Sequence, residues 1–289
     1  MNDSQFELHA QIEQRHWWFT ARREIIRRLI AMLVPPGEGK QVVDIGCGTG
    51  ANIASLANGY RCTGIDVSAR ATELARQRFP DTEFVCGVAP EAVRRQIEAA
   101  SLVTIMDVLE HVADDFELLS KLLNASCPGT YFIVTVPADQ RLWSPHDEHL
   151  GHYRRYDFDR LKSTWLGLPV TCLMLSYFNA RLYPAIRLMR LLTSWAKTTA
   201  GSAGTDLRLP SAPMNRLLHR MFAGEAESLC HALESGGGPA YKRGVSLIAV
   251  LRREEGELLA RKRPASIAAD FFLPTVRPAG SHFNDPTTR

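Results

Sequence analysis

Short apolar runs alternate along the chain with segments whose apolar residues recur every three or four positions. The short runs predict strands at residues 42–45, 61–65, 83–86, 101–106, 130–136, 170–175 and 244–252. The periodic segments predict helices at residues 51–56, 69–78, 91–98, 114–123 and 157–166. Strands that alternate with helices in this way indicate a parallel sheet with helices on both faces. We therefore expect an α/β fold with a seven-stranded, mostly parallel sheet.

The residues before the first predicted strand carry a helical pattern of their own. Their apolar positions are Phe6, Ile12, Trp18, Phe19, Ile25, Ile26 and Leu29. Pro35, Pro36 and Gly37 end this segment, because proline and glycine interrupt helices. Residues 1–36 are therefore expected to form an N-terminal helical unit that precedes a core at residues 37–179.

A long helical insertion is expected before the last strand. A minimal sheet of this kind does not need residues 180–243, in which residues 182–195 form a strongly apolar helical pattern with arginines interspersed. A basic amphipathic helix can cover a substrate pocket, form a dimer face or lie in a membrane interface, and all three remain open for this helical cap. Residues 244–256 then hold the last strand. The proline-containing tail at residues 257–289 is expected to be irregular or extended.

Residues 42–50, VVDIGCGTG, place three glycines directly after the first predicted strand. Glycine permits positive φ and lets a ligand lie against the bare main chain. The helix expected at residues 51–56 would direct its N-terminal amides toward the same ligand. Gly46, Gly48 and Gly50 thus predict a nucleotide-like ligand beyond the carboxyl end of this strand.

Two acidic residues narrow the choice of ligand. Asp66 lies at the end of the second predicted strand, where a carboxylate would accept hydrogen bonds from ribose hydroxyls. Asp44, beside the glycine turn, would repel a pyrophosphate and attract a ligand that carries an ammonium and a sulfonium. The glycine spacing is also GxGxG instead of GxGxxG. These features favour S-adenosylmethionine over a nicotinamide dinucleotide.

Three ordered blocks resemble class I S-adenosylmethionine-dependent methyltransferases. They are VVDIGCGTG at residues 42–50, GIDVS at 64–68 and IMDVLEHVADD at 105–115. The third block is most similar to the branch that includes the ubiquinone-biosynthesis O-methyltransferases. Flanking segments at residues 16–26 and 146–161 resemble a bacterial subgroup of the same family. The resemblance implies a Rossmann-like core, with residues 1–36 as a helical lid over the cofactor.

The resemblance also implies a set of cofactor-binding residues: Trp18, Arg22, Asp44, Gly46, Cys47, Gly48, Asp66, Val67, Gly87, Val88, Asp107, Val108 and Leu109. Trp18 can equally serve as core packing. The family usually has an acidic residue near the adenine amine at the position of Val88. Adenine is therefore expected to be held here by backbone and apolar contacts.

Histidines beyond the fourth predicted strand are the candidates for a catalytic base, which a hydroxyl or ammonium acceptor would need. His111, His149 and His152 are proposed for this role, with a structural histidine as the alternative for His111. Acceptor contacts are expected from Trp17, His146, Tyr153, Arg154 and Tyr156, with a structural role for the Arg-Tyr cluster and core packing for Trp17 as alternatives. His146, His149 and His152 recur every third residue, but Pro145 and Gly151 favour a loop that spreads them apart. No metal site is therefore predicted.

Composition and charge exclude several other classes. The net charge of +3 over 289 residues forms no stripe for nucleic acid. Six cysteines without CxxC spacing indicate reduced, buried thiols. The polar N-terminus lacks a signal-peptide core, and no apolar stretch reaches about 18 uncharged residues. A cytoplasmic protein is expected, with contact at the inner membrane face as the alternative that the helix at 182–195 leaves open.

These observations together predict an S-adenosylmethionine-dependent methyltransferase. The acceptor is expected to be small and fairly apolar, such as a natural-product, lipid or quinone-like intermediate, methylated by in-line displacement. Two alternatives remain: a non-catalytic module that binds the cofactor, and a nicotinamide-dependent oxidoreductase. The sequence does not select oxygen, nitrogen or carbon as the atom methylated.

Overall fold

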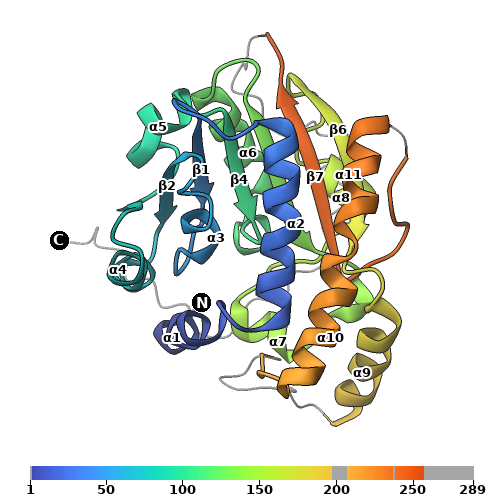
Figure 1. Ribbon diagram of the computed structural model, residues 1–289. Helices are drawn as coiled ribbons and strands as arrows, with labels where there is room; N and C mark the ends of the chain where they lie inside the picture. The colour runs from blue at the N-terminus through green and yellow to red at the C-terminus, as the bar shows by residue number, and fades with distance from the viewer. Residues whose placement is uncertain (1, 197–206, 237, 257–289) are drawn as a thin grey trace, which may run out of the picture.

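Seven strands form one sheet in the computed structural model, which describes residues 2–196, 207–236 and 238–256 (Figure 1). The strand order is β3-β2-β1-β4-β5-β7-β6. The strands are β1 (Gln41–Ile45), β2 (Arg61–Asp66), β3 (Glu83–Cys86), β4 (Leu102–Met106), β5 (Tyr131–Pro137), β6 (Val170–Phe178) and β7 (Ser246–Arg253).

The sheet is mixed, with a single reversed strand. Strands β1 to β5 pair in parallel, and Val43 of β1 lies opposite both Thr63 of β2 and Val103 of β4. Strand β7 runs antiparallel to both of its neighbours, β5 and β6. The expected seven-stranded, mostly parallel Rossmann-like sheet is confirmed. The carboxyl ends of β1 to β5 therefore share one edge, at the lower end of the molecule in Figure 1.

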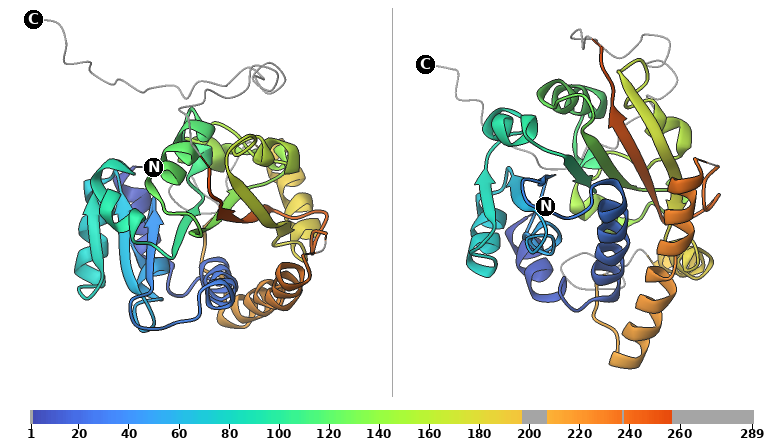
Figure 2. Two further views of the ribbon diagram at one scale, coloured as in Figure 1. Left: turned by 90° about the horizontal axis from the view of Figure 1, so that it is seen from above. Right: turned by 45° about the horizontal axis from the view of Figure 1, so that its top comes forward.

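Helices cover both faces of this sheet (Figure 2). The α-helices are α1 (Asp3–Ile12), α2 (Trp17–Leu33), α3 (Ala51–Ala54), α4 (Ala69–Arg78), α5 (Arg94–Glu98), α6 (Asp115–Ala125), α7 (Pro145–Leu150), α8 (Phe158–Lys162), α9 (Tyr183–Ala196), α10 (Ala212–Ala223) and α11 (Ala226–Ser235). Short 3-10 turns are η1 (Glu91–Val93), η2 (Leu109–His111) and η3 (Gln140–Leu142). No helix among the described residues is both long enough and apolar enough to span a bilayer.

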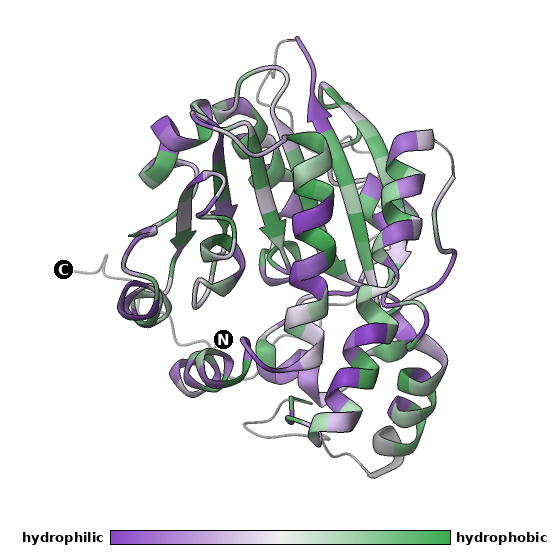
Figure 3. Cartoon of the chain, in the orientation of Figure 1, coloured by the Kyte–Doolittle hydropathy of each residue, from purple (hydrophilic) through white to green (hydrophobic). Residues whose placement is uncertain are grey.

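Two hydrophobic clusters, one on each face of the sheet, form the core. Val42 points into one cluster and its neighbour Val43 into the other, because successive side chains of a strand face opposite sides. Both faces are therefore buried, which explains why the central strands β4 and β5 are nearly continuous apolar runs (Figure 3). Ile25 and Leu29 of α2 are fully buried in the first cluster, and each such side chain contributes about 1.5–3 kcal/mol.

The N-terminal helices have two different roles. Much of α2 belongs to the core layer, while its first turns reach the edge where β1 and β4 end. Helix α1 lies over the region beyond β1, where the buried side chain of Glu13 accepts a hydrogen bond from Thr49 Oγ1 at 2.7 Å. The N-terminal unit thus meets the glycine loop and also completes the core.

The insertion before the last strand is confirmed, and it contains α9, α10 and α11. Helices α10 and α11 pack against α2, and Phe222 of α10 is fully buried beside Phe178 of β6. Helices α10 and α11 therefore form part of the hydrophobic core in addition to belonging to the helical cap. The tail expected at residues 257–289 lies outside the described residues.

The loop predicted around residues 145–151 is wrong, because α7 occupies this stretch. Ser144 caps α7 in a capping box with Asp147, Pro145 stands in the first turn, and Gly151 ends the helix in a left-handed conformation. Proline at the start and glycine after the end mark the boundaries of a helix. The loop prediction is wrong because it treats both residues as helix breakers.

Candidate active site

The glycine loop turns sharply beyond β1. Gly46, Gly48 and Gly50 have φ values of 69°, 54° and 88°, in the left-handed region that disfavours other residues. A side chain on Gly46 would also overlap Val108, which follows β4. The loop therefore brings the ends of β1 and β4 together, at the point where strand order reverses.

Asp66 holds the shape of this loop. Its two carboxylate oxygens accept hydrogen bonds from the backbone amides of Gly48 and Ser68, both at 2.9 Å. Burial raises the pKa of Asp66, while these amide donors oppose that shift. Each oxygen retains a lone pair that a ribose hydroxyl could use.

Asp44 is a buried carboxylate at the end of β1. Only 1% of it is exposed, and Thr104 Oγ1 of β4 donates a hydrogen bond to its Oδ1 at 2.6 Å. Burial raises the pKa of Asp44 to about 7, although the Thr104 hydrogen bond and the charge on Arg22 act in the opposite direction. Such a group is poised to bind a cation, because a positive ligand would favour its ionised form.

Arg22 of α2 and Asp107, which follows β4, form an ion pair at the site. Asp107 has a φ of 57°, unusual for a non-glycine residue, and its carboxylate pairs with the guanidinium of Arg22 on α2. The guanidinium lies 4.2 Å from the centre of the Trp18 ring. Burial lowers the pKa of Arg22 to about 10, and the charge on Asp44 counteracts this. The Nε of Arg22 is buried without a hydrogen-bond partner among the described residues.

Two exposed apolar side chains follow strands β2 and β3. Val67 after β2 is 74% exposed and Val88 after β3 is 63% exposed, whereas most large apolar residues here are buried. A side chain on Gly87 would meet Ala92. The ends of β2 and β3 thus offer an apolar surface that a flat aromatic ring could cover. This surface agrees with the apolar adenine contacts expected for Val88.

Three further candidates for cofactor binding, Leu109, Cys47 and Val108, are partly or fully buried. Leu109 is fully buried in the core, so only its backbone faces the site. Cys47 is buried as well, and burial raises the pKa of its thiol well above the ordinary value. Val108 is half-buried against Gly46. These residues shape the loop and are unsuited to making polar side-chain contacts with a ligand.

The glycine loop also has a partner that the sequence did not reveal. Glu13, at the end of α1, bonds to Thr49 and pairs with Arg78 of α4. Arg78 Nη1 also donates to the Thr49 carbonyl at 3.0 Å. Nothing in the local pattern around Glu13 marks this contact, because it joins residues 36 and 65 positions apart.

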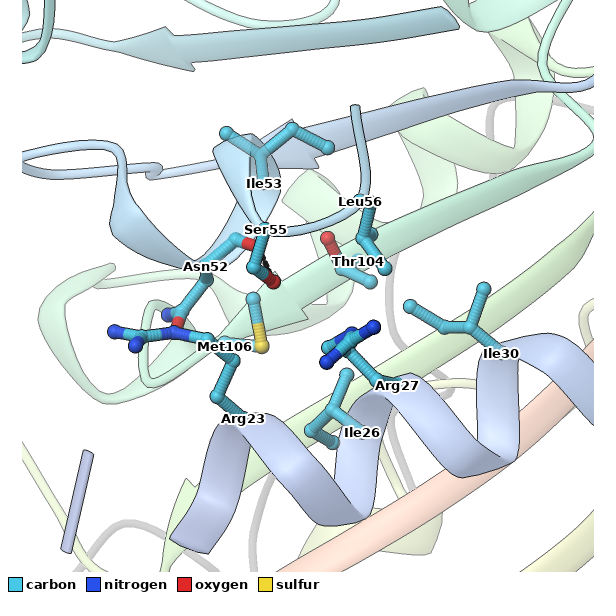
Figure 4. Close-up of a pocket in the computed structure, with 10 residues that line it drawn as sticks. All are labelled: Arg23, Ile26, Arg27, Ile30, Asn52, Ile53, Ser55, Leu56, Thr104 and Met106. Atoms are coloured by element: carbon cyan, nitrogen blue, oxygen red, sulfur yellow. Dashed lines mark hydrogen bonds between the residues drawn. The ribbon is translucent and has the colours of Figure 1, made fainter. Parts of the chain in front are cut away.

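A narrow cavity lies between α2 and residues of α3 and β4 (Figure 4). Arg23, Ile26, Arg27 and Ile30 of α2 line one side, facing Asn52, Ile53, Ser55, Leu56, Thr104 and Met106. Its volume of about 10 Å³ suffices for roughly one water molecule. It is therefore a packing feature and cannot receive an organic acceptor.

The structure brings two of the predicted catalytic histidines together. The rings of His111 and His152 meet edge to face with centroids 4.7 Å apart. Burial lowers the pKa of His111 to about 3, and the neighbouring His152 adds to this effect. His152 Nδ1 lies 2.9 Å from Asp147 Oδ1, which orients the ring. Although burial acts to raise it, the His152 hydrogen bond and the Arg155 charge hold the pKa of Asp147 well below its ordinary range.

Glu110, between β4 and these histidines, is fully buried. Neither of its carboxylate oxygens has a hydrogen-bond partner among the described residues. Burial raises the pKa of Glu110 to about 8, against the opposing effect of Arg22. An unpartnered buried carboxyl is costly and needs an explanation.

His149, the third predicted catalytic histidine, lies apart from this pair, whereas His146 lies nearer to it. His149 is exposed on α7, where its Nδ1 is 2.6 Å from the Pro145 carbonyl. His146 approaches His152 with ring centroids 6.5 Å apart. Helix α7 therefore separates His149 from the His111–His152 pair.

Arg154 and Tyr156, from which acceptor contacts are predicted, have hydrogen-bond partners within the fold. The Tyr156 hydroxyl donates to Asp115 Oδ2 at 2.9 Å, and its ring is 1% exposed within the core. Arg154 donates to the Val112 carbonyl at 2.7 Å and to Asp115 at 3.2 Å. Both side chains bind residues at and before the start of α6, which agrees with the structural role given as the alternative for the Arg-Tyr cluster. Tyr153 stays 38% exposed and remains a candidate.

Trp17 points away from the glycine loop. Its ring packs edge to face with Phe222 of α10 at 6.2 Å, and its backbone amide donates to Asn215. This contact anchors α2 to the insertion. The structure favours core packing for Trp17, whereas Trp18 on the adjacent position stacks on Arg22.

Comparison with known families adds a result that is independent of this geometry. A model described as "Methyltransferase domain" matches residues 17–197, which is more than half of the chain.

Curated relatives match over shorter stretches. The trans-aconitate 2-methyltransferase of Paracidovorax citrulli is 33% identical over 111 residues, covering 37% of this chain and 43% of the relative. The ubiquinone biosynthesis O-methyltransferase of Pectobacterium atrosepticum is 31% identical over 111 residues, covering 36% and 46%. The chain thus spans less than half the length of these relatives. The enzyme of the same name from Proteus mirabilis is 26% identical over 167 residues, covering 50% and 68%.

Solved structures share the fold at low identity. The methyltransferase in a complex with the Trm112 activator of Haloferax volcanii has a TM-score of 0.52 at 17% identity, covering 88% of this chain and 96% of that one. The plantazolicin methyltransferase BamL, solved with S-adenosylhomocysteine, has a TM-score of 0.51 at 13% identity, covering 87% and 91%. By its matching family model, its sheet and its glycine loop, the chain belongs to the class I S-adenosylmethionine-dependent methyltransferase family.

Proposed function

We propose that this protein transfers a methyl group from S-adenosylmethionine to a small, fairly apolar acceptor. The observation that carries the proposal is the buried Asp44 carboxylate beside three glycines in left-handed conformations. A pyrophosphate would be repelled there, whereas a ligand with an ammonium and a sulfonium would be attracted. Bound S-adenosylmethionine supplies an electrophilic methyl group on its sulfonium.

Each part of the donor has a matching group on this chain. Asp66 offers its remaining lone pairs to the ribose hydroxyls, and Val67 and Val88 offer an apolar surface to the adenine. The buried, unpartnered Nε of Arg22 suits a carboxylate. The residues present therefore fit this ligand, including at the position where Val88 departs from the family pattern.

The experiment that tests this function is calorimetric titration of the purified chain with S-adenosylhomocysteine, followed by an assay with labelled donor and candidate acceptors. Binding and transfer are expected. Binding without transfer to any acceptor would favour the non-catalytic module. Thermal stabilisation by NADP, with none by S-adenosylhomocysteine, would establish the oxidoreductase instead.

Thr104→Val should weaken donor binding at neutral pH. Without the Thr104 hydroxyl, Asp44 loses the hydrogen bond that favours its ionised form, so its pKa rises further above about 7. A hydrogen bond to a charged group contributes about 1.5–3 kcal/mol, which corresponds to a loss of affinity of roughly tenfold or more at pH 7. Calorimetry at pH 7 and pH 9 measures this. Affinity should recover at pH 9, and an equal loss at both pH values would contradict the explanation.

We further propose that the insertion contacts an anionic membrane surface. Large exposed apolar side chains of the described residues gather on and between α9 and α10: Leu188, Met189, Leu191, Leu192, Leu209, Met214 and Leu217. Residues 181–223 contain six arginines and one lysine against a single acid, Asp206. Apolar side chains with surrounding positive charge are typical of interfacial helices. Helices α9 and α10 lie at the end of the molecule where β1 to β5 terminate (Figure 1).

Negative charges introduced at apolar positions of α9 test this contact. The wild type is expected to float with phosphatidylglycerol-containing vesicles and not with phosphatidylcholine alone. Leu188→Asp combined with Leu192→Asp should reduce flotation at least about tenfold, since each buried leucine contributes about 1.5–3 kcal/mol. Leu166→Asp, at a leucine 51% exposed elsewhere, is the matched control. A chain that never floats, but forms dimers that the double variant disrupts, would show that this surface is a dimer face.

A further inference from the structure

Glu110, His111 and His152 bring three potential metal ligands to one point beyond β4. One ligand atom from each residue lies within 4.8 Å of the other two. The first two residues belong to η2 and the third follows α7, so the cluster exists only in the folded chain. In residues 2–196, 207–236 and 238–256, no other three such side chains meet this criterion.

The described residues provide no hydrogen-bond partner for the buried carboxylate of Glu110. It is 0% exposed, and neither Oε1 nor Oε2 has a hydrogen-bond partner there. Buried polar atoms are normally satisfied by protein, ordered water or an ion. A cation between Glu110 and the imidazoles would satisfy both oxygens and neutralise the charge.

A hydrogen bond on one side of the ring orients His152. His152 Nδ1 lies 2.9 Å from Asp147 Oδ1, which leaves Nε2 as the atom with a free lone pair. Metal-ligating histidines characteristically donate their other N–H to a carboxylate or a backbone carbonyl in this way. Asp147 is itself fixed by Arg155 at 2.9 and 3.1 Å.

The ligand set and its spacing indicate the class of ion. One carboxylate and two imidazoles suit Zn²⁺ and the neighbouring divalent transition metals, whereas Mg²⁺ and Ca²⁺ prefer oxygen ligands alone. Ligand bonds of about 2.1 Å place two ligands of one ion at most about 4.2 Å apart. Shifts of less than about an ångström would therefore suffice to close the cluster around an ion.

We propose that Glu110, His111 and His152 bind one divalent transition-metal ion. Three protein ligands leave coordination positions open, as in catalytic metal sites. Water or an oxygen atom of the acceptor would fill them, and this last role alone rests on the proposed methyltransferase function. His111 and His152 would then act as ligands, which differs from the catalytic-base role expected from the sequence.

Titration with Co²⁺ alone tests the site, because visible absorption of the bound ion reports its ligands directly. The full chain is treated with chelator, dialysed and titrated. We expect one equivalent to bind, and Glu110→Gln, His111→Gln or His152→Gln each to raise the Kd at least about 100-fold. His149→Gln is the control for metal binding, since α7 holds this imidazole apart from the cluster. Far-UV circular dichroism confirms that each variant is folded.

The outcomes separate this proposal from the methyltransferase proposal. No uptake of Co²⁺, or uptake that these three variants leave unchanged, would overturn the metal site. Retained S-adenosylhomocysteine binding in the folded His152→Gln variant shows that the loss is confined to the metal. A wild type that binds Co²⁺ through these residues, but no S-adenosylhomocysteine, would leave the metal site standing while removing the proposed methyl donor.

Discussion

Asp44→Asn should strongly weaken donor binding and yet make the folded chain more stable above pH 7. The carboxylate is 1% exposed, and burial raises its pKa to about 7. Asparagine keeps the shape and can still accept the Thr104 hydrogen bond, but it carries no charge to desolvate. Because the pKa of Asp44 rises from 3.8 to about 7, we expect the free energy of unfolding of the variant to exceed that of the wild type by about 4 kcal/mol at most. Donor affinity should fall about 10- to 100-fold or more.

The pH dependence of this gain follows from proton linkage. Between pH 4 and about pH 7, folded Asp44 retains a proton that the unfolded chain has already released. The free energy of unfolding of the wild type therefore falls as pH rises through this window. The asparagine variant does not titrate there, so its advantage is small near pH 4, grows toward pH 7 and is constant above it.

Denaturant unfolding at pH 4, 7 and 8.5, together with calorimetric titration of S-adenosylhomocysteine, measures both effects. Asp81→Asn is the matched control, because this aspartate is exposed on a turn and should change neither quantity. A variant that binds the ligand normally would contradict the role of Asp44. So would a loss of stability that is the same at every pH.

Asp115→Ala is expected to destabilise the fold by about 3–5 kcal/mol. Asp115 is 0% exposed and accepts hydrogen bonds from Tyr156 at 2.9 Å and Arg154 at 3.2 Å, with Arg160 at 3.4 Å. Removing the anion would leave two largely buried guanidinium groups and a buried hydroxyl without this partner. The start of α6 and the segment after α7 would lose their main connection.

The neighbouring Asp114 provides a sharp control for this effect. Asp114 caps α6 by accepting a hydrogen bond from the Glu117 amide at 2.9 Å, in an exposed position. Asp114→Ala should cost only about 1 kcal/mol, as expected for the loss of an N-cap. Thermal unfolding compares the two, since each kcal/mol lowers the Tm of a chain this large by about 2–4 °C. Equal losses at both positions would show that Asp115 acts only through the helix end.

The sequence by itself determined the sheet and the glycine loop that follows β1. Strand and helix periods are local properties, so the alternation of apolar runs predicted seven strands in the correct places. The left-handed conformations at Gly46, Gly48 and Gly50 follow from residue type. Asp44 and Asp66 end adjacent parallel strands, which brings them to one edge without further information. The family model then matched the region that these motifs span.

Only the tertiary structure decided which polar side chains meet one another and which of them are buried. The sequence predicted acceptor contacts from Arg154 and Tyr156, whereas Asp115, about 40 positions earlier, accepts their hydrogen bonds. His111 and His152 meet across a similar separation, with Glu110 buried beside them. Local patterns carry no information about such contacts, because hydrogen bonds and burial between distant segments arise only when the sheet and its covering helices are assembled.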